Sequence, residues 1–226
     1  MIPLRDVIPS RTFPLITVAV IAANALIFLF QLLLDERASH VFVYTFGLVP
    51  LHFSAFTVLT SMFLHGGIAH FLGNMLYLWI FGDNVEDRMG HLRFVVFYLM
   101  CGTAAALAQA WADPASDVPM VGASGAIAGV MGAYIVLYPH SRVLTLLPFP
   151  IMVFEVPAVV LLGLWFGLQF LSGLGSLASV ARGDAPMGGI AFWAHVAGFA
   201  AGALGVFLFR RPERQRVEWW DTTTGG

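Results

Sequence analysis

The sequence lacks lysine altogether and has a single cysteine among its 226 residues. That thiol, Cys101, excludes an internal disulfide framework, and its apolar neighbours predict a small packing residue. Charged residues make up only 11% of the chain, against about 25% in an ordinary soluble domain. The formal net charge of -2 gives no basic surface for nucleic acid. The scarcity of charge excludes a soluble globular enzyme, and we expect no nucleic-acid partner.

Apolar side chains are what the chain has in excess. They make up 59% of the residues, and the mean hydropathy is +0.84. A water-soluble core of this size has no room for so many, so lipid must be the solvent for much of the surface. The runs lack the strict alternation of a β-barrel, which leaves helices as the way to satisfy the backbone in lipid. We predict an all-α membrane protein with six spans, at 14–34, 67–85, 92–111, 124–138, 157–174 and 188–209.

The placement of arginine predicts the orientation of these spans, because short loops rich in Lys and Arg stay in the cytoplasm. An N-in, C-in topology leaves only Arg37 and Arg182 outside. The other arginines are then cytoplasmic: Arg5, Arg11, Arg88, Arg93, Arg142, Arg210, Arg211, Arg214 and Arg216. The chain divides into a cytoplasmic N-terminus (1–12), a six-helix domain (13–209) and a cytoplasmic tail (210–226). A short N-terminus without a transit-type segment favours a prokaryotic plasma membrane.

Polar side chains at membrane depth are expensive and mark candidate functional residues. His70 and Asn74 are four residues apart, which puts them on one face of the second helix near its outer end. His65 lies in the loop that leads into that helix. The alternative is that these residues form hydrogen bonds between helices, as polar residues in membrane helices commonly do.

Ser124 begins the fourth run, between Gly122 and Gly125. Residues 124–138 form a helix of about 22 Å, shorter than the hydrocarbon core of about 30 Å. Ser124 is therefore expected below the outer surface, beside free backbone N–H groups that would stabilise an oxyanion. The alternative is an ordinary N-cap serine.

His195 lies in the last run, one and a half to two turns from its outer end, at a depth similar to that of Ser124. Gly125 and Gly198 belong to small-residue faces that allow close helix packing, and a serine–histidine hydrogen bond requires such packing. Twelve of the thirteen carboxylates fall in loops or tails and Glu155 lies at the cytoplasmic entrance of the fifth helix, so the pattern predicts a catalytic dyad. A packing histidine is one alternative. A zinc site of His65, His70 and His195 is another, although no HExxH motif is present.

Three motifs, HGGIAHFLGN, GASG and AHVAG, lie on the second, fourth and sixth predicted helices. Together they resemble the rhomboid intramembrane serine proteases, over residues 13–209. The resemblance implies a six-helix rhomboid-like bundle and an intramembrane serine endopeptidase that works through an acyl-enzyme, without metal or cofactor. It implies that the active site opens to the external or periplasmic side. The fifth helix resembles the family's lateral gate.

The same resemblance implies roles for individual residues. Ser124 would be the nucleophile and His195 the general base, with His70, Asn74 and the backbone N–H of Ser124 as the oxyanion hole. The supporting residues would be His65, Gly122, Gly125 and Gly198, and the structural residues would be Glu86 and Arg88 in FGDNVEDRMG. The chain departs from the family at two places. Phe56 and Thr57 replace a Trp-Arg pair, and Ala128 replaces an aromatic residue that stacks on the histidine.

The expected partners are membrane lipid and single-spanning membrane proteins, cut near the outer end of their transmembrane helix. The sequence leaves the oligomeric state open. Two other classes remain as alternatives. One is a non-catalytic rhomboid-like chaperone or adaptor, which would tolerate loss of Ser124. The other is a small transporter, although the sequence shows no inverted repeat.

Overall fold

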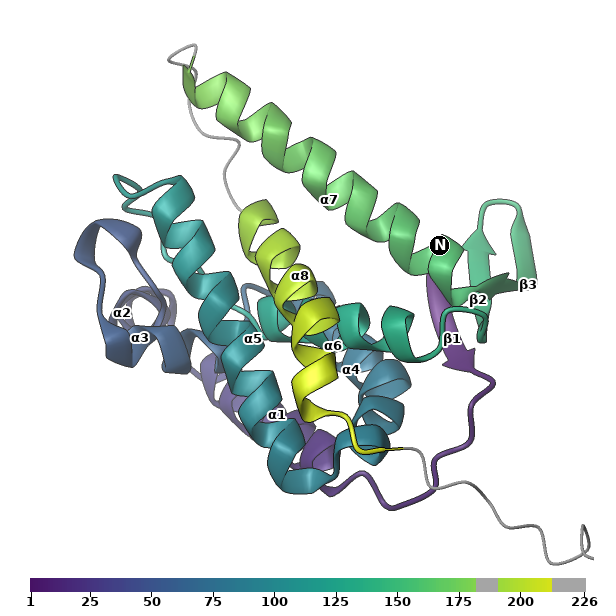
Figure 1. Cartoon of the computed structure of the whole chain (residues 1–226). Coiled ribbons are helices and arrows are strands. Elements are labelled where there is room, and N and C mark those ends of the chain that lie inside the picture. Colours follow the sequence, from purple (N-terminus) through teal and green to yellow (C-terminus); the bar gives the residue numbers. More distant parts are fainter. Residues whose placement is uncertain (182–190, 213–226) are drawn as a thin grey trace, which may run out of the picture.

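A computed structural model describes residues 1–181 and 191–212 of the chain. Figure 1 shows a bundle of helices with a small β-sheet beside one end. The long helices are α1 (Leu15–Leu32), α4 (Ile68–Met89), α5 (His91–Ala112), α6 (Ser124–Leu137), α7 (Ala158–Ala181) and α8 (Phe192–Phe209). Between α1 and α4, the predicted external loop contains α2 (Glu36–Phe46), η1 (Pro50–His52), α3 (Ala55–Thr60) and η2 (Ser61–Phe63).

The helical membrane bundle is confirmed. Among the described residues, four helices are long and apolar enough to cross a membrane: α1, α5, α7 and α8. The α3–η2 segment and α4 pass the same test together, with a bend of 90° between them. Helix α6 has only 14 residues, which agrees with the expected short fourth helix. The count of six crossings and the N-in, C-in topology stay predictions.

Each predicted span corresponds to one long helix. The predicted start of the sixth span at residue 188 lies outside the described residues, as do Arg182, Arg214 and Arg216 and the tail from residue 213 onward. At the end of α8, the N–H of Arg211 donates to the carbonyl of Arg88 at 2.7 Å. This contact places the ends of α4 and α8 together.

Helix α6 lies at the centre of the bundle, and all its residues from Gly125 to Tyr134 are buried. Its closest neighbour is α8. A Cβ placed on Gly198 would collide with the carbonyl oxygen of Gly125, and one placed on Gly202 would collide with that of Gly129. The two backbones therefore touch along their glycine faces, as small residues allow in membrane helices.

A three-stranded antiparallel sheet, which the sequence analysis did not predict, lies at one end of the bundle (Figure 1). Its order is β1 (Ile2–Asp6), β2 (Arg142–Pro148) and β3 (Ile151–Pro157). Asp6 at the end of β1 accepts hydrogen bonds from the hydroxyl of Tyr134 at 2.6 Å and the amide of Asn84 at 2.9 Å. The N-terminal strand is thereby joined to α6 and α4.

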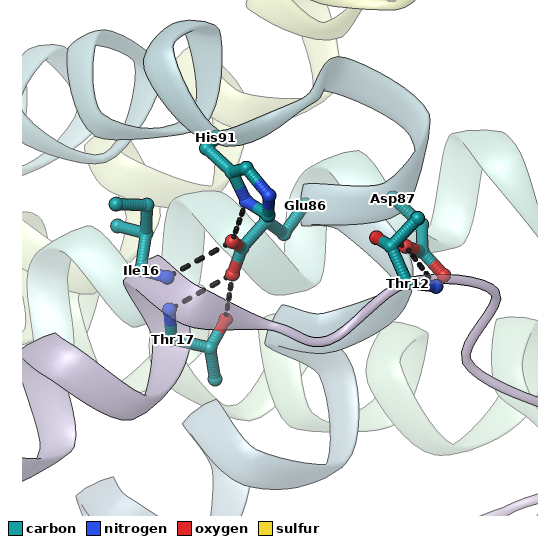
Figure 2. A network of polar contacts seen from close by, with 6 residues as sticks. All are labelled: Thr12, Ile16, Thr17, Glu86, Asp87 and His91. Atoms are coloured by element: carbon teal, nitrogen blue, oxygen red, sulfur yellow. Dashed lines mark hydrogen bonds and ion pairs between the residues drawn. The ribbon is translucent and has the colours of Figure 1, made fainter.

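Glu86, on α4, accepts hydrogen bonds from the free backbone N–H groups in the first turn of α1. Its carboxylate accepts from the backbone N–H groups of Ile16 at 2.9 Å and Thr17 at 2.8 Å, and from the Thr17 hydroxyl at 2.8 Å (Figure 2). His91 contacts the same carboxylate through Nδ1 at 2.5 Å. Pro14, the residue before α1, provides no side-chain cap for these groups, which a helix start leaves without intrahelical partners. Glu86 and Arg88 thus both join helix ends, far along α4 from His70.

Candidate active site

Ser124 and His195 come together through the packing of α6 against α8. Ser124 is the first residue of α6, and His195 lies in the first turn of α8. The serine Oγ lies 2.8 Å from Nε2 of the imidazole. Ala123 precedes the helix with no side-chain cap, so the first N–H groups of α6 have no capping side chain from that residue.

The second nitrogen of His195 contacts a residue that the sequence analysis missed. Nδ1 lies 2.8 Å from Oε1 of Gln169 on α7. An amide oxygen can only accept, so Nδ1 is the donor, and in a neutral ring Nδ1 then carries the single proton. Nε2 is then the acceptor, and the Ser124 hydroxyl donates to it. The available signal was that Gln169 is the one amide in the apolar run 157–174.

Trp165 also lies against the imidazole, with ring centroids 5.6 Å apart and planes inclined by 43°. Ala128, where some family members carry a stacking aromatic, is fully buried in α6. In this chain the aromatic neighbour of His195 therefore comes from α7. At the other position where the chain departs from the family pattern, Phe56 is exposed and Thr57 donates to the carbonyl of Ser54 at 2.9 Å.

His70 and Asn74 lie beside the backbone that leads into Ser124. Gly122 has a φ of 126°, in the region that favours glycine. A Cβ there would lie 2.7 Å from the His70 ring and 3.6 Å from Nδ2 of Asn74. The Asn74 Nδ2 is buried and has no hydrogen-bond partner among the described residues. An unpaired donor is thus available where a carbonyl oxygen could be bound.

His65 is buried and packs against His70. The two rings meet edge to face, with centroids 5.3 Å apart. Gln31 on α1 fixes the backbone of His65, accepting from its N–H at 3.0 Å and donating to its carbonyl at 3.3 Å. Within residues 1–181 and 191–212, no group of three His, Cys, Asp or Glu side chains is placed to hold a metal ion.

Taken together, the site holds a serine hydroxyl within hydrogen-bond distance of an imidazole nitrogen, at the start of a helix and next to the side chains of His70 and Asn74. These are the parts that acyl transfer requires: a nucleophile with a base, an oriented base, and donors for a developing oxyanion.

Comparison with known proteins places the chain in a family. The Rhomboid domain matches residues 52–212. Rhomboid protein 1, mitochondrial, of Saccharomyces cerevisiae is 31% identical over 169 residues, which cover 72% of this chain and 44% of the yeast protein. Rhomboid protease GluP of Bacillus subtilis is 40% identical over 85 residues, or 38% of this chain and 16% of that protein.

Presenilin-associated rhomboid-like protein, mitochondrial, of Mus musculus is 29% identical over 125 residues, or 54% of this chain and 33% of the mouse protein. The matches thus cover less than half the length of each of these three relatives. Two of them are named as mitochondrial, so the comparisons give no support to a prokaryotic plasma membrane in particular. A multi-pass integral membrane protein is confirmed. Since the domain match extends over most of the sequence and includes Ser124 and His195, this chain belongs to the rhomboid family.

Proposed function

We propose that the protein is an intramembrane serine endopeptidase that uses Ser124 and His195 as a catalytic dyad. The observation that carries this proposal is the 2.8 Å contact between the serine Oγ and Nε2 of the histidine. An N-cap role for Ser124 or a packing role for His195 would not need this contact.

In the proposed reaction the Ser124 oxygen attacks the carbonyl carbon of the scissile peptide bond, and its proton passes to Nε2 of His195. The oxyanion that forms is stabilised by the N–H of Ser124 and by donors from Asn74 and His70. The peptide C–N bond then breaks, and the leaving amine takes the proton from His195. Water attacks the remaining ester, with His195 again as the base, and Ser124 is released.

Single-spanning membrane proteins are the proposed substrates. A transmembrane helix keeps its carbonyl groups in its own hydrogen-bond ladder, so the segment must unwind locally before Ser124 can attack. Helices with Gly, Pro or polar residues near their outer end should therefore be favoured. The relative from Bacillus subtilis is named as a protease, which is consistent with this class of activity.

The test is labelling of the detergent-purified chain with a fluorophosphonate probe, which reacts with activated serines. Wild type should be labelled, and Ser124→Ala and His195→Ala should each abolish labelling while elution in gel filtration stays unchanged. Ser39→Ala, in α2, is the matched control and should label like wild type. Absence of labelling in folded wild type would contradict the proposal. It would favour the non-catalytic adaptor, whose membrane partners should still crosslink to Ser124→Ala.

A further inference from the structure

Helix α7 carries a polar contact to the proposed base on an otherwise apolar helix. Trp165 and Gln169 are one turn apart and both reach His195. The opposite side of the helix is exposed, including Leu164, Leu168 and Leu171. Figure 1 shows α7 on the outside of the bundle. The contact from Gln169 is thus supplied by an outer helix rather than by the central pair that carries Ser124 and His195.

The chemistry of the contact decides the state of the imidazole. A neutral imidazole has one protonated nitrogen and one acceptor nitrogen, and the hydrogen bond at one position sets the other. With Oε1 of Gln169 accepting from Nδ1, the lone pair of Nε2 faces Ser124. Without that acceptor the ring is free to place its proton on Nε2, and the serine hydroxyl then has no base.

The same amide oxygen also supports the ring after it has taken the serine proton. An imidazolium is a donor at both nitrogens, and the Gln169 oxygen continues to accept at Nδ1. Gln169 is the hydrogen-bond partner of Nδ1 among the described residues, and no carboxylate has this place. A neutral amide thus provides the orientation that an aspartate provides in a serine protease triad.

We propose that Gln169 is the positioning residue of His195, and that the site is competent only while α7 lies against α8. The proposal rests on the proposed function of Ser124 and His195. It adds a requirement to any opening of α7: the Gln169 contact must be kept, or formed again, before the serine attacks.

The kinetic test replaces the acceptor without changing the length of the side chain. Gln169→Met should lower the kcat for cleavage of a transmembrane substrate by about 10-fold to 100-fold, the range known for partners that orient a metal-bound histidine, with KM changed less than about twofold. Gln169→Glu keeps an acceptor oxygen and should retain most of the activity. Leu168→Met, on the exposed side of α7, is the matched control and should behave as wild type.

A second measurement needs no turnover. In ¹⁵N-histidine NMR of the full chain in detergent, with the His195 signals assigned through His195→Ala, wild type should show a protonated Nδ1. Gln169→Met should move the proton partly or wholly to Nε2. An unchanged NMR spectrum, or an unchanged kcat, in folded Gln169→Met overturns the proposal. Failure of the proposed function is distinguished by wild type itself, which would then not label with fluorophosphonate although the Nδ1 proton is present.

Discussion

The amide of Asn74 is a buried donor without a partner among the described residues. Such a group is costly unless a bound oxygen completes its hydrogen bonding during the reaction. We therefore predict that Asn74→Ala lowers kcat by about 10-fold to 10³-fold, the range for one oxyanion donor, with little change in thermal stability. The measurement is single-turnover cleavage of a transmembrane substrate.

The matched control for Asn74 is Asn24→Ala in α1, a buried asparagine whose amide donates to the carbonyl of Val20 at 2.8 Å. It should leave kcat unchanged per folded molecule. Equal rates for wild type and Asn74→Ala would remove Asn74 from the proposed oxyanion hole.

The sequence indicated Ser124 and His195 for physical reasons, since both sit at the same depth on helices with small-residue faces. Their mutual distance follows from that packing, so it was within reach of a sequence argument. Gln169 was not, because a lone amide in an apolar helix has no periodic partner to reveal which neighbour it faces. Only the rotation of α7 in the packed bundle decides that it points to Nδ1 of His195.

Among the contacts between helices, the close glycine packing of α6 against α8 should be the one on which the site depends most. We predict that Gly198→Leu destabilises the protein and abolishes labelling, because the added carbons meet the backbone of Gly125 rather than a movable side chain. Gly198→Ala should lower stability by about 1–3 kcal/mol, as overpacking does. Thermal denaturation in detergent measures both.

Gly175→Ala is the control for this helix contact, since a Cβ on Gly175 would meet nothing within 4 Å. It should keep both the melting temperature and the labelling rate. If Gly198→Ala behaves like Gly175→Ala, the two helices have room to separate, and close packing is not what brings the serine to the histidine.

The attachment of β1 should depend on pH. Burial, the largest cause, and the nearby Asp83 together raise the pKa of Asp6 from 3.8 to about 6, although the hydrogen bond from Tyr134 opposes the shift. Because the folded pKa is the higher one, the stabilising contribution is complete below about pH 4 and is lost as pH rises through 6. We predict slower hydrogen exchange of the β1 amides at pH 5 than at pH 7, after correction for intrinsic exchange rates.

Two variants test the origin of this pH effect. Asp6→Asn should remove the dependence, whereas Asp35→Asn, at the exposed start of α2, should keep it. Protection of β1 that increases from pH 5 to pH 7 would contradict the assignment to Asp6.

The β-sheet could not be predicted from the sequence, for two reasons. The strands RVLTLLP and IMVFEVP are short apolar segments, which periodicity does not separate from helix or loop. The remaining strand, β1, pairs with a strand far away in the sequence, since Ile2 lies opposite Leu146. Long helices repeat their pattern many times and are therefore predicted well, but a strand of five residues gives too few repeats.

At the scale of the whole molecule, composition was enough to predict a helical membrane protein, because only lipid can solvate such an apolar surface. Backbone contacts also show which chain segments lie together at each end of the helical bundle. The carbonyl of Arg88 ties α4 to the residues after α8, while Leu48 and Met120 pair between the two predicted external loops. The predicted topology assigns these two ends to opposite sides of the membrane.

This topology can be measured with single cysteines and a membrane-impermeant maleimide. Cys101 is fully buried and should give no background. We predict that Val118→Cys is labelled in intact cells and that Val7→Cys is labelled only after the membrane is opened. The two valines are about half exposed, so a difference in reactivity reflects the side of the membrane. The reverse pattern would contradict the N-in, C-in assignment.

The pairing of β1 with β2 also bears on the order in which the protein is made. Residues 2–6 leave the ribosome before α1, but their partner strand follows α6. The sheet can therefore close only after α1, α4, α5 and α6 have been synthesised. During biogenesis, β1 therefore stays without its partner strand at least until the helix that bears Ser124 has been made.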